Sequence, residues 1–488
     1  MEELYQMSST TTTENLVRRF VKTASVYIPQ VPKPKKKISL TEKFVWTGIA
    51  LLAYLVMAQI PLYGVTDDPR FDFLAFARVI FAAQQGTLME LGIGPIVTAG
   101  LLMQLLKGSG LIKMDFKNPD DRSLFTSATK IVTIIVIVAE GTLYGASVYG
   151  PLTADNAPYA IYVVIAQLIG ASIIVMLMDE MVQKGWGIGS GLSLFIMAGI
   201  AQTILWNTVS VVPADDGYVG ILPFTIQVSL DGHAADALFR TGQLPSIFTL
   251  SLTIAVILVL VYIEGIHVDI PIVSTKYRGF TAVYPIKLLY TSVIPVILAS
   301  ALVANAVFMG QMLWANYNPN NQNPAFNWIA QFDPNSSGGR ATPTGGILYY
   351  MTSPRSLDVV AADPVRAVVY VVFMTAIVTV FSRLWVELGG LSAKTAARNL
   401  LDADVQVPGF RRSEGSVEVL LNKYIPSLTI ISGIIIGLLA SVSDVLNVFG
   451  SGTGILLMVS IMVSYYQTLV KEQVDTYLPS LAALLGRK

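Results

Sequence analysis

The chain has 488 residues, of which 53% are hydrophobic and 13% are charged, and a mean hydropathy of +0.61, which excludes a soluble domain and indicates a polytopic membrane protein. The formal net charge is zero, so the overall charge implies no acidic partner. Cysteine is absent and the two histidines, His233 and His267, lie far apart, so we expect no disulfide, metal cluster or other cofactor.

The first 43 residues form a polar tail ahead of the first apolar run. We expect the Ser/Thr-rich beginning of this tail to be disordered and a short helix to follow near residues 14–27. Pro29, Pro32 and Pro34 then stand among four lysines. This composition predicts a stiff, basic segment directly before the first membrane helix.

Ten apolar runs of about 20 residues follow, which is the length that a helix needs to cross the hydrocarbon layer. They lie at residues 44–63, 87–106, 126–148, 157–178, 188–207, 247–264, 287–309, 365–386, 425–448 and 454–470. We therefore predict an all-α membrane protein with ten transmembrane helices.

The basic residues predict how these helices are oriented. If the tail lies in the cytoplasm and the spans alternate, most lysines and arginines fall on the cytoplasmic side. The outer segments then hold only Arg70, Arg78, Arg240, Arg340, Arg355 and Arg366. Such an excess follows the positive-inside rule, so we expect a protein of the cell membrane with both termini in the cytoplasm.

A long polar break after the fifth span suggests two halves. The N-terminal half covers residues 44–207, an external connector covers 208–246, the C-terminal half covers 247–470, and a cytoplasmic tail covers 471–488. Five spans per half force the second half to enter from the opposite side, so a repeat would be inverted. Similar glycine-rich entries at residues 187–191 and 450–454 weakly support such a repeat.

Residues 70–83 form an apolar stretch with sparse charges between the first two spans. The stretch is too short and too charged to cross a bilayer. It is either an interfacial helix or a re-entrant helix buried in protein, and the residues by themselves leave both readings open.

Two predicted cytoplasmic loops, at residues 265–286 and 388–424, are unusually long and basic. The second contains a tight tip at residues 407–412 that ends in Arg411 and Arg412. Paired arginines at an exposed turn suit phosphate contacts. The alternative is a positive-inside loop that touches only water and lipid headgroups.

Few polar groups lie inside the predicted spans. Glu140, in the third span, is a functional candidate because a buried acid is costly, although it could also be a structural acid between helices. Thr98 and Asn305 are milder cases that usually bond a neighbouring helix. This scarcity disfavours an ion channel, and no nucleotide or catalytic motif indicates an enzyme. From these features alone, a secondary transporter with inverted repeats is favoured over a scaffold subunit.

The second span opens with two glycines and a proline at residues 92–95, which allow a sharp turn from loop into helix. Ile93 and Val97 are four residues apart and share one face of this helix. Without further information, they are ordinary packing residues.

Several motifs, in the same order along the chain, resemble those of the SecY family, whose members form the central subunit of the Sec protein-conducting channel. The residues of these motifs are similar to those of the archaeal type. They are Gly-Thr-Leu at 86–88, Gly-Ile-Gly-Pro-Ile-Val-Thr-Ala-Gly at 92–100, Met-Gln-Leu-Leu at 103–106, Gly-Ile-Gly-Ser-Gly at 187–191, Tyr-Pro-Ile-Lys at 284–287, Ile-Pro-Val-Ile-Leu at 294–298, Gly-Phe-Arg at 409–411, Tyr-Ile-Pro at 424–426 and Gly-Thr-Gly at 452–454. The resemblance runs from about residue 30 to the C-terminus.

The resemblance implies two five-helix halves around an hourglass pore, hinged on one side and open to lipid on the other. It places a ring of branched aliphatic residues in the pore: Ile93, Val97, Leu192, Ile196, Ile297 and Leu457. Such a ring can yield around an extended peptide yet offers hydrated ions no ligands. The expected function is to translocate unfolded secretory polypeptides and to release transmembrane segments and signal sequences into lipid.

The same resemblance assigns three further sites. A re-entrant plug helix at about residues 71–85 includes Phe73, Leu74, Phe76, Val79 and Ile80. A polar cluster at the lateral gate comprises Thr98, Glu140 and Asn305. The loops offered to the ribosome carry Lys276, Arg278, Arg411 and Arg412.

The resemblance also implies partners. They are two small membrane subunits of the SecE and Secβ types, the ribosome, signal sequences and nascent polypeptides, and membrane lipid. The chain would need no cofactor and would not be an enzyme.

Overall fold

The structure is a computed structural model of the whole chain. It describes residues 18–19, 21–36, 38–65, 78–108, 111–112, 118–146, 159–214, 217–240, 244–274, 281–318, 321–332, 343–354, 356–402, 405–408 and 413–477.

Ten helices of these described residues occupy the ten predicted spans. They are α2 (Leu40–Met57), α4 (Gly94–Gly108), α5 (Pro119–Tyr144), α6 (Ala160–Met181), α7 (Gly191–Val209), α9 (Ile247–Gly265), α10 (Ile294–Tyr317), α14 (Pro364–Leu388), α16 (Glu414–Val445) and α17 (Gly452–Tyr477). Nine of them are long and apolar enough to cross a membrane. The exception is α4, which has 15 residues and begins at Gly94 instead of residue 87.

Short elements connect these helices. The helical ones are α3 (Arg78–Phe81), the π-helix η3 (Val182–Trp186), α8 (Ile221–Leu230), the 3-10 helix η4 (Ala234–Ala237), α11 (Pro324–Asn327), α12 (Ile347–Met351), α13 (Leu357–Ala362) and α15 (Ala393–Asp402). The strands are β1 (Pro213–Ala214), β2 (Gly217–Tyr218), β3 (His267–Ser274), β4 (Thr281–Lys287), β5 (Gln331–Phe332), β6 (Pro343–Gly345) and β7 (Val405–Gln406). In the tail, residues 18–19 and 21–27 are helical, as the sequence predicted.

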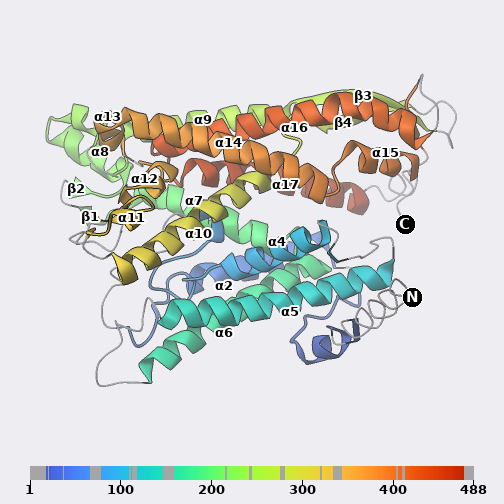
Figure 1. Ribbon diagram of the computed structural model, residues 1–488, viewed down its shortest axis with the longest axis horizontal. Coiled ribbons are helices and arrows are strands. Elements are labelled where there is room, and N and C mark those ends of the chain that lie inside the picture. Colours follow the sequence, from blue (N-terminus) through green and yellow to red (C-terminus); the bar gives the residue numbers. More distant parts are fainter. Residues whose placement is uncertain are drawn as a thin grey trace. The chain divides into compact units, whose positions relative to one another are not determined.

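The chain divides into two compact units. The first comprises Met1–Pro69, Phe81–Phe195 and Lys471–Lys488, and the second comprises Arg70–Ile80 and Ile196–Val470. In the first unit, α4 packs against α5 and α5 packs against α6. In the second unit, α14 packs against α16, and the two run side by side in Figure 1.

Side-chain caps mark where several helices begin. Ser39 forms a capping box ahead of α2, and Ser246 forms one ahead of α9. The side chain of Asn118 accepts a hydrogen bond from the backbone N–H of Asp120 at the start of α5, whose first residue is a proline. These residues satisfy backbone N–H groups that have no partner within the helix. The polar residue before α2, α5 and α9 therefore fixes where each of these three helices begins.

The two long basic loops are structured at their bases. The first forms a β-hairpin in which β3 pairs with β4, from His267 opposite Lys287 to Val273 opposite Thr281. Alternate residues of the hairpin share a face, and on that face Ile270 and Ile286 are buried with Leu400 of α15. Hydropathy alone did not predict this small packed layer, because its apolar residues are too few for a membrane span.

Candidate functional site

The six residues of the predicted ring share one structural feature. Each lies at the beginning of a membrane helix, within the first two turns or directly before them. They are Ile93 and Val97 at α4, Leu192 and Ile196 at α7, Ile297 at α10 and Leu457 at α17. The first three belong to the first unit and the other three to the second.

Ile93 is fixed by the backbone immediately before α4. Its N–H donates to the carbonyl oxygen of Phe81 at 2.7 Å, and its side chain is fully buried. Gly92 has φ +54°, and a Cβ at this position would lie 2.1 Å from the same carbonyl oxygen. Only glycine fits there, so the turn that aims Ile93 depends on Gly92.

A fully buried carboxylate lies in the same turn. Glu90 accepts a bond from the hydroxyl of Tyr144, at 2.8 Å, and another from the backbone N–H of Gly86. Glu90 was not among the predicted site residues, because it lies at the beginning of a predicted span and not in its middle. The contact holds the turn before α4 against the end of α5.

The start of α7 is held by an acid from the end of α6. Asp179 accepts the backbone N–H of Leu192 at 2.9 Å with one oxygen and the amide of Gln183 at 2.7 Å with the other. A Cβ on Gly191 would lie 2.7 Å from the Cα of Asp179, so the two helices meet where a glycine allows close approach. Leu192 is therefore positioned by a hydrogen bond to a buried acid.

An equivalent arrangement occurs in the second unit, where α16 ends and α17 begins. Asp444 accepts the backbone N–H of Gly452 at 2.8 Å and the hydroxyl of Tyr370 at 3.0 Å. A Cβ on Gly452 would lie 2.2 Å from the carbonyl oxygen of Ala440. Asp444 lies near the end of a predicted span, where an acid by itself indicates no role. Its role is to fix the helix start that carries Leu457.

The start of α10 is joined to α16 by two buried hydroxyls. The side chains of Thr291 and Ser432 lie 2.9 Å apart and are both fully buried. Val296 is also fully buried, whereas its neighbour Ile297 is half-buried. Ile297 therefore points away from the packed side of α10.

Two of the predicted gate residues lie on neighbouring helices of the first unit. Thr98 is exposed on α4, and Glu140 is half-buried in the last turns of α5, which packs against α4. Asn305 lies in α10, in the second unit. The polar cluster itself stays a prediction.

The end of the predicted plug is anchored to the first unit. Val79 and Ile80 lie in α3, whereas Phe73, Leu74 and Phe76 fall outside the described residues. After α3, the hydroxyl of Tyr54 donates to the carbonyl oxygen of Ala82 at 3.1 Å. Together with the bond from Ile93 to Phe81, this contact fixes the last part of the predicted plug.

The bases of the two basic loops lie together. The four predicted ribosome-docking residues, Lys276, Arg278, Arg411 and Arg412, fall outside the described residues. The flanking strands form one sheet in the order β4-β3-β7, with Ser274 paired to Val405. Two segments about 130 residues apart in the sequence therefore belong to one small sheet.

The pattern of membrane helices agrees with comparisons to known proteins. A SecY family model matches residues 87–466, and a model of the plug domain of Sec61p matches residues 52–86. The first match covers well over half of the chain. The chain belongs to the SecY family.

Relatives of this SecY family member match it over nearly their whole length. The protein translocase subunit SecY of Pyrococcus horikoshii is 40% identical over 470 residues, which is 94% of this chain and 97% of that protein. The Sec61 subunit alpha of Dictyostelium discoideum, a protein transport protein, is 39% identical over 464 residues, which is 93% of this chain and 96% of that protein.

Solved structures of the family match the fold. One described as a protein conducting channel has a TM-score of 0.75 and 38% identity, and it covers 93% of this chain and 97% of its own. Sec61 in the canine ribosome-channel complex from the endoplasmic reticulum has a TM-score of 0.74 and 37% identity, with the same coverage. The predicted SecY fold, with its membrane helices and plug, is confirmed. The prediction that the protein is a channel and not an enzyme is also confirmed, because the relatives and solved structures it matches are translocase subunits and protein-conducting channels.

Proposed function

We propose that this SecY family member is the channel subunit through which unfolded secretory polypeptides cross the membrane, and which releases signal sequences and transmembrane segments into lipid. The observation that supports this proposal most directly is the placement of the six aliphatic residues at four helix starts. Each of the four starts is fixed by a buried hydrogen bond or a close backbone approach.

The aliphatic ring would act as the seal. Branched aliphatic side chains present no ligand that could replace the water around an ion, and a narrow apolar constriction tends to lose its water. The same side chains can change rotamer around an extended polypeptide. A ring of Ile93, Val97, Leu192, Ile196, Ile297 and Leu457 would therefore pass a chain and resist ion leak.

The plug and the lateral gate complete this proposed mechanism. The plug would rest beneath the ring on the outer side, with its end anchored at Phe81 and Ala82. Polar contacts among Thr98, Glu140 and Asn305 would hold the gate closed. Such contacts contribute about 0.6 kcal/mol each, whereas an entering signal sequence gains roughly 0.8 kcal/mol per CH₂ transferred. A signal sequence can therefore open the gate by itself.

We also assign partners and location as part of this proposal. The ribosome is the proposed partner of the two basic loops, since Sec61 of a ribosome-channel complex is a structural relative and strands of both loops form one sheet. Phosphates of ribosomal RNA would suit Lys276, Arg278, Arg411 and Arg412. By family resemblance, small subunits of the SecE and Secβ types complete the channel. The distribution of basic residues supports a cell-membrane protein with both termini in the cytoplasm.

Site-specific crosslinking to a trapped chain tests the channel proposal. The chain has no cysteine, so each single-cysteine variant carries one probe. With a ribosome-stalled precursor that bears a signal sequence and one cysteine, Ile93→Cys and Ile297→Cys should form disulfides with the precursor. Leu258→Cys is the matched control, because this residue is 64% exposed on the apolar helix α9. Equal crosslinking at all three positions would overturn the ring, and a metabolite carrier or scaffold would trap no precursor at all.

A further inference from the structure

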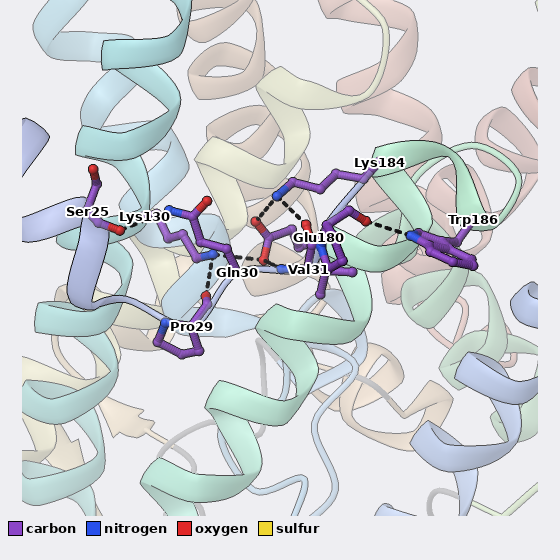
Figure 2. A network of polar contacts seen from close by, with 9 residues as sticks. Ser25, Pro29, Gln30, Val31, Lys130, Glu180, Lys184 and Trp186 are labelled. Atoms are coloured by element: carbon purple, nitrogen blue, oxygen red, sulfur yellow. Dashed lines mark hydrogen bonds and ion pairs between the residues drawn. The ribbon is translucent and has the colours of Figure 1, made fainter. Parts of the chain in front are cut away.

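A carboxylate surrounded by two lysines lies near the end of α6. Glu180 accepts bonds from Lys130 of α5 and from Lys184 of η3, each at 2.8 Å. The three side chains are only 12 to 24% exposed. Figure 2 shows Glu180 between the two ammonium groups. Because the Glu180 carboxylate pairs with one lysine from α5 and one from η3, it joins both elements to the end of α6.

The same three side chains bind the main chain of the N-terminal tail. Lys130 donates to the carbonyl oxygen of Pro29 at 2.6 Å, and Lys184 donates to that of Val31. Glu180 accepts the backbone N–H of Val31 at 3.2 Å. The contacts join residues that are 101 to 153 positions apart in the sequence. The tail is therefore bound through its backbone by charged side chains that also pair with one another.

A tryptophan extends this binding to the next residue. The indole N–H of Trp186 donates to the carbonyl oxygen of Pro32 at 2.8 Å. The ring of Trp186 meets Trp46 of α2 edge to face, with centroids 5.4 Å apart. The hydroxyl of Thr47 in α2 accepts the backbone N–H of Ile188 at 3.0 Å. The tail, α2, α5 and the end of α6 thus meet at one place.

The sequence of the tail suits this binding. Proline fixes φ and disfavours helix at the residue before it, so Pro29, Pro32 and Pro34 favour an extended backbone, and residues 29–34 form neither helix nor strand. An extended segment presents its carbonyl oxygens outward, where donors can reach them. Ahead of it, Arg18 pairs with Asp121 at the start of α5, at 3.0 Å. The tail is thus held at two places on the same helix.

We propose that residues 29–32 form a latch across the middle of α5 and the end of α6, and that Glu180 is the positioning residue that closes it. Replacing this carboxylate would remove the acceptor of Val31 and leave Lys130 and Lys184 without their shared counter-ion. The latch deepens the proposed channel function and rests on it. Because α5 packs against α4, which carries Val97 and Thr98, the latch stiffens the half of the channel that a signal sequence must displace.

Thiol labelling tests the latch without any transport. Val31→Cys keeps the backbone contacts and places a probe at a half-buried position of a cysteine-free chain. Adding Glu180→Gln should raise its rate of maleimide labelling about tenfold, because hydrogen bonds to charged groups are among the strong ones. Trp186→Phe removes one donor only and should give a smaller rise. An unchanged rate in both backgrounds would overturn the latch.

Two controls separate the latch from general destabilisation. Glu472→Gln neutralises an acid that pairs with Lys43 in the same unit, at 2.8 Å, and should leave the labelling of Val31→Cys unchanged. Val26→Cys, at a residue that is 78% exposed, should label equally fast with and without Glu180→Gln. Glu180→Asp keeps the charge and should restore slow labelling in part. A rise caused equally by Glu472→Gln would overturn the assignment to Glu180.

A transport readout tests the role in gating. In a graded series of leucine/alanine signal segments, Glu180→Gln should lower the number of leucines needed for insertion, while a strongly apolar signal is transported as before. A threshold that does not move while labelling rises would overturn the gating role. If the unaltered chain, with its partners, transports no precursor, the proposed function fails, whereas the labelling result still decides the latch.

Discussion

Replacing Asp444 by alanine should destabilise the second unit, because the change removes two buried hydrogen bonds at the start of α17. The N–H of Gly452 loses its cap, which costs about 1 kcal/mol. The hydroxyl of Tyr370, a residue only 4% exposed, loses its acceptor, which costs about 1–3 kcal/mol. The free energy of unfolding should therefore fall by about 2–4 kcal/mol. Denaturant titration of the purified protein in detergent measures this change.

Three further variants sharpen this test. Tyr370→Phe should cost less than Asp444→Ala, and a double-mutant cycle between them should reveal a coupling of about 1 kcal/mol. Asp179→Ala, at the equivalent place in the other unit, should have an effect of similar size. Asp358→Ala changes an exposed acid and should cost less than about 0.5 kcal/mol. If Asp444→Ala costs no more than this control, the capping role is wrong.

The remaining predictions concern the seal, the docking loops and the gate. Ile93→Asn combined with Ile297→Asn should raise the ion conductance of the resting channel in planar bilayers, because amides supply ligands that aliphatic groups lack. Reversal of Arg411 and Arg412 to glutamate should weaken ribosome binding, most strongly at low salt, in co-sedimentation. Thr98→Leu should change how apolar a signal segment must be before it inserts.

Each of these predictions has a clear contrary result. Unchanged conductance would count against the ring, and Leu258→Asn on the exposed face of α9 should leave conductance unaltered in any case. Co-sedimentation that is the same at every salt concentration would rule out docking through the arginine pair. An insertion threshold that stays constant would make Thr98 a structural residue only.

Features that depend on local sequence were predictable. A helix forms its backbone hydrogen bonds within one segment, so the length and hydropathy of each segment were enough to locate the ten membrane helices. The start of the second helix was harder, because Leu88, Met89 and Leu91 continue the apolar run, although residues 88–91 form turns and bends that lead to Gly92. The ring residues and the family followed from ordered motifs rather than from periodicity. Ile93 and Val97 by themselves would pass for ordinary packing residues.

The missed residues have partners that are distant in the sequence. Glu90 is bonded to Tyr144, 54 positions away, and Asp444 to Tyr370, 74 positions away. No window of the sequence contains both members of such a pair. The sheet β4-β3-β7 and the contact between Glu180 and the tail, 149 positions apart, were missed for the same reason.

The sequence by itself therefore determined that this protein lies in a membrane, where its helices run and to which family it belongs. Transfer into the membrane and helix formation depend on local sequence, and short ordered motifs indicate the family. Only the tertiary structure decided which buried acids hold the helix starts and where the tail is bound. A buried carboxylate is stable only when donors converge on it, and those donors come from segments that folding alone brings together.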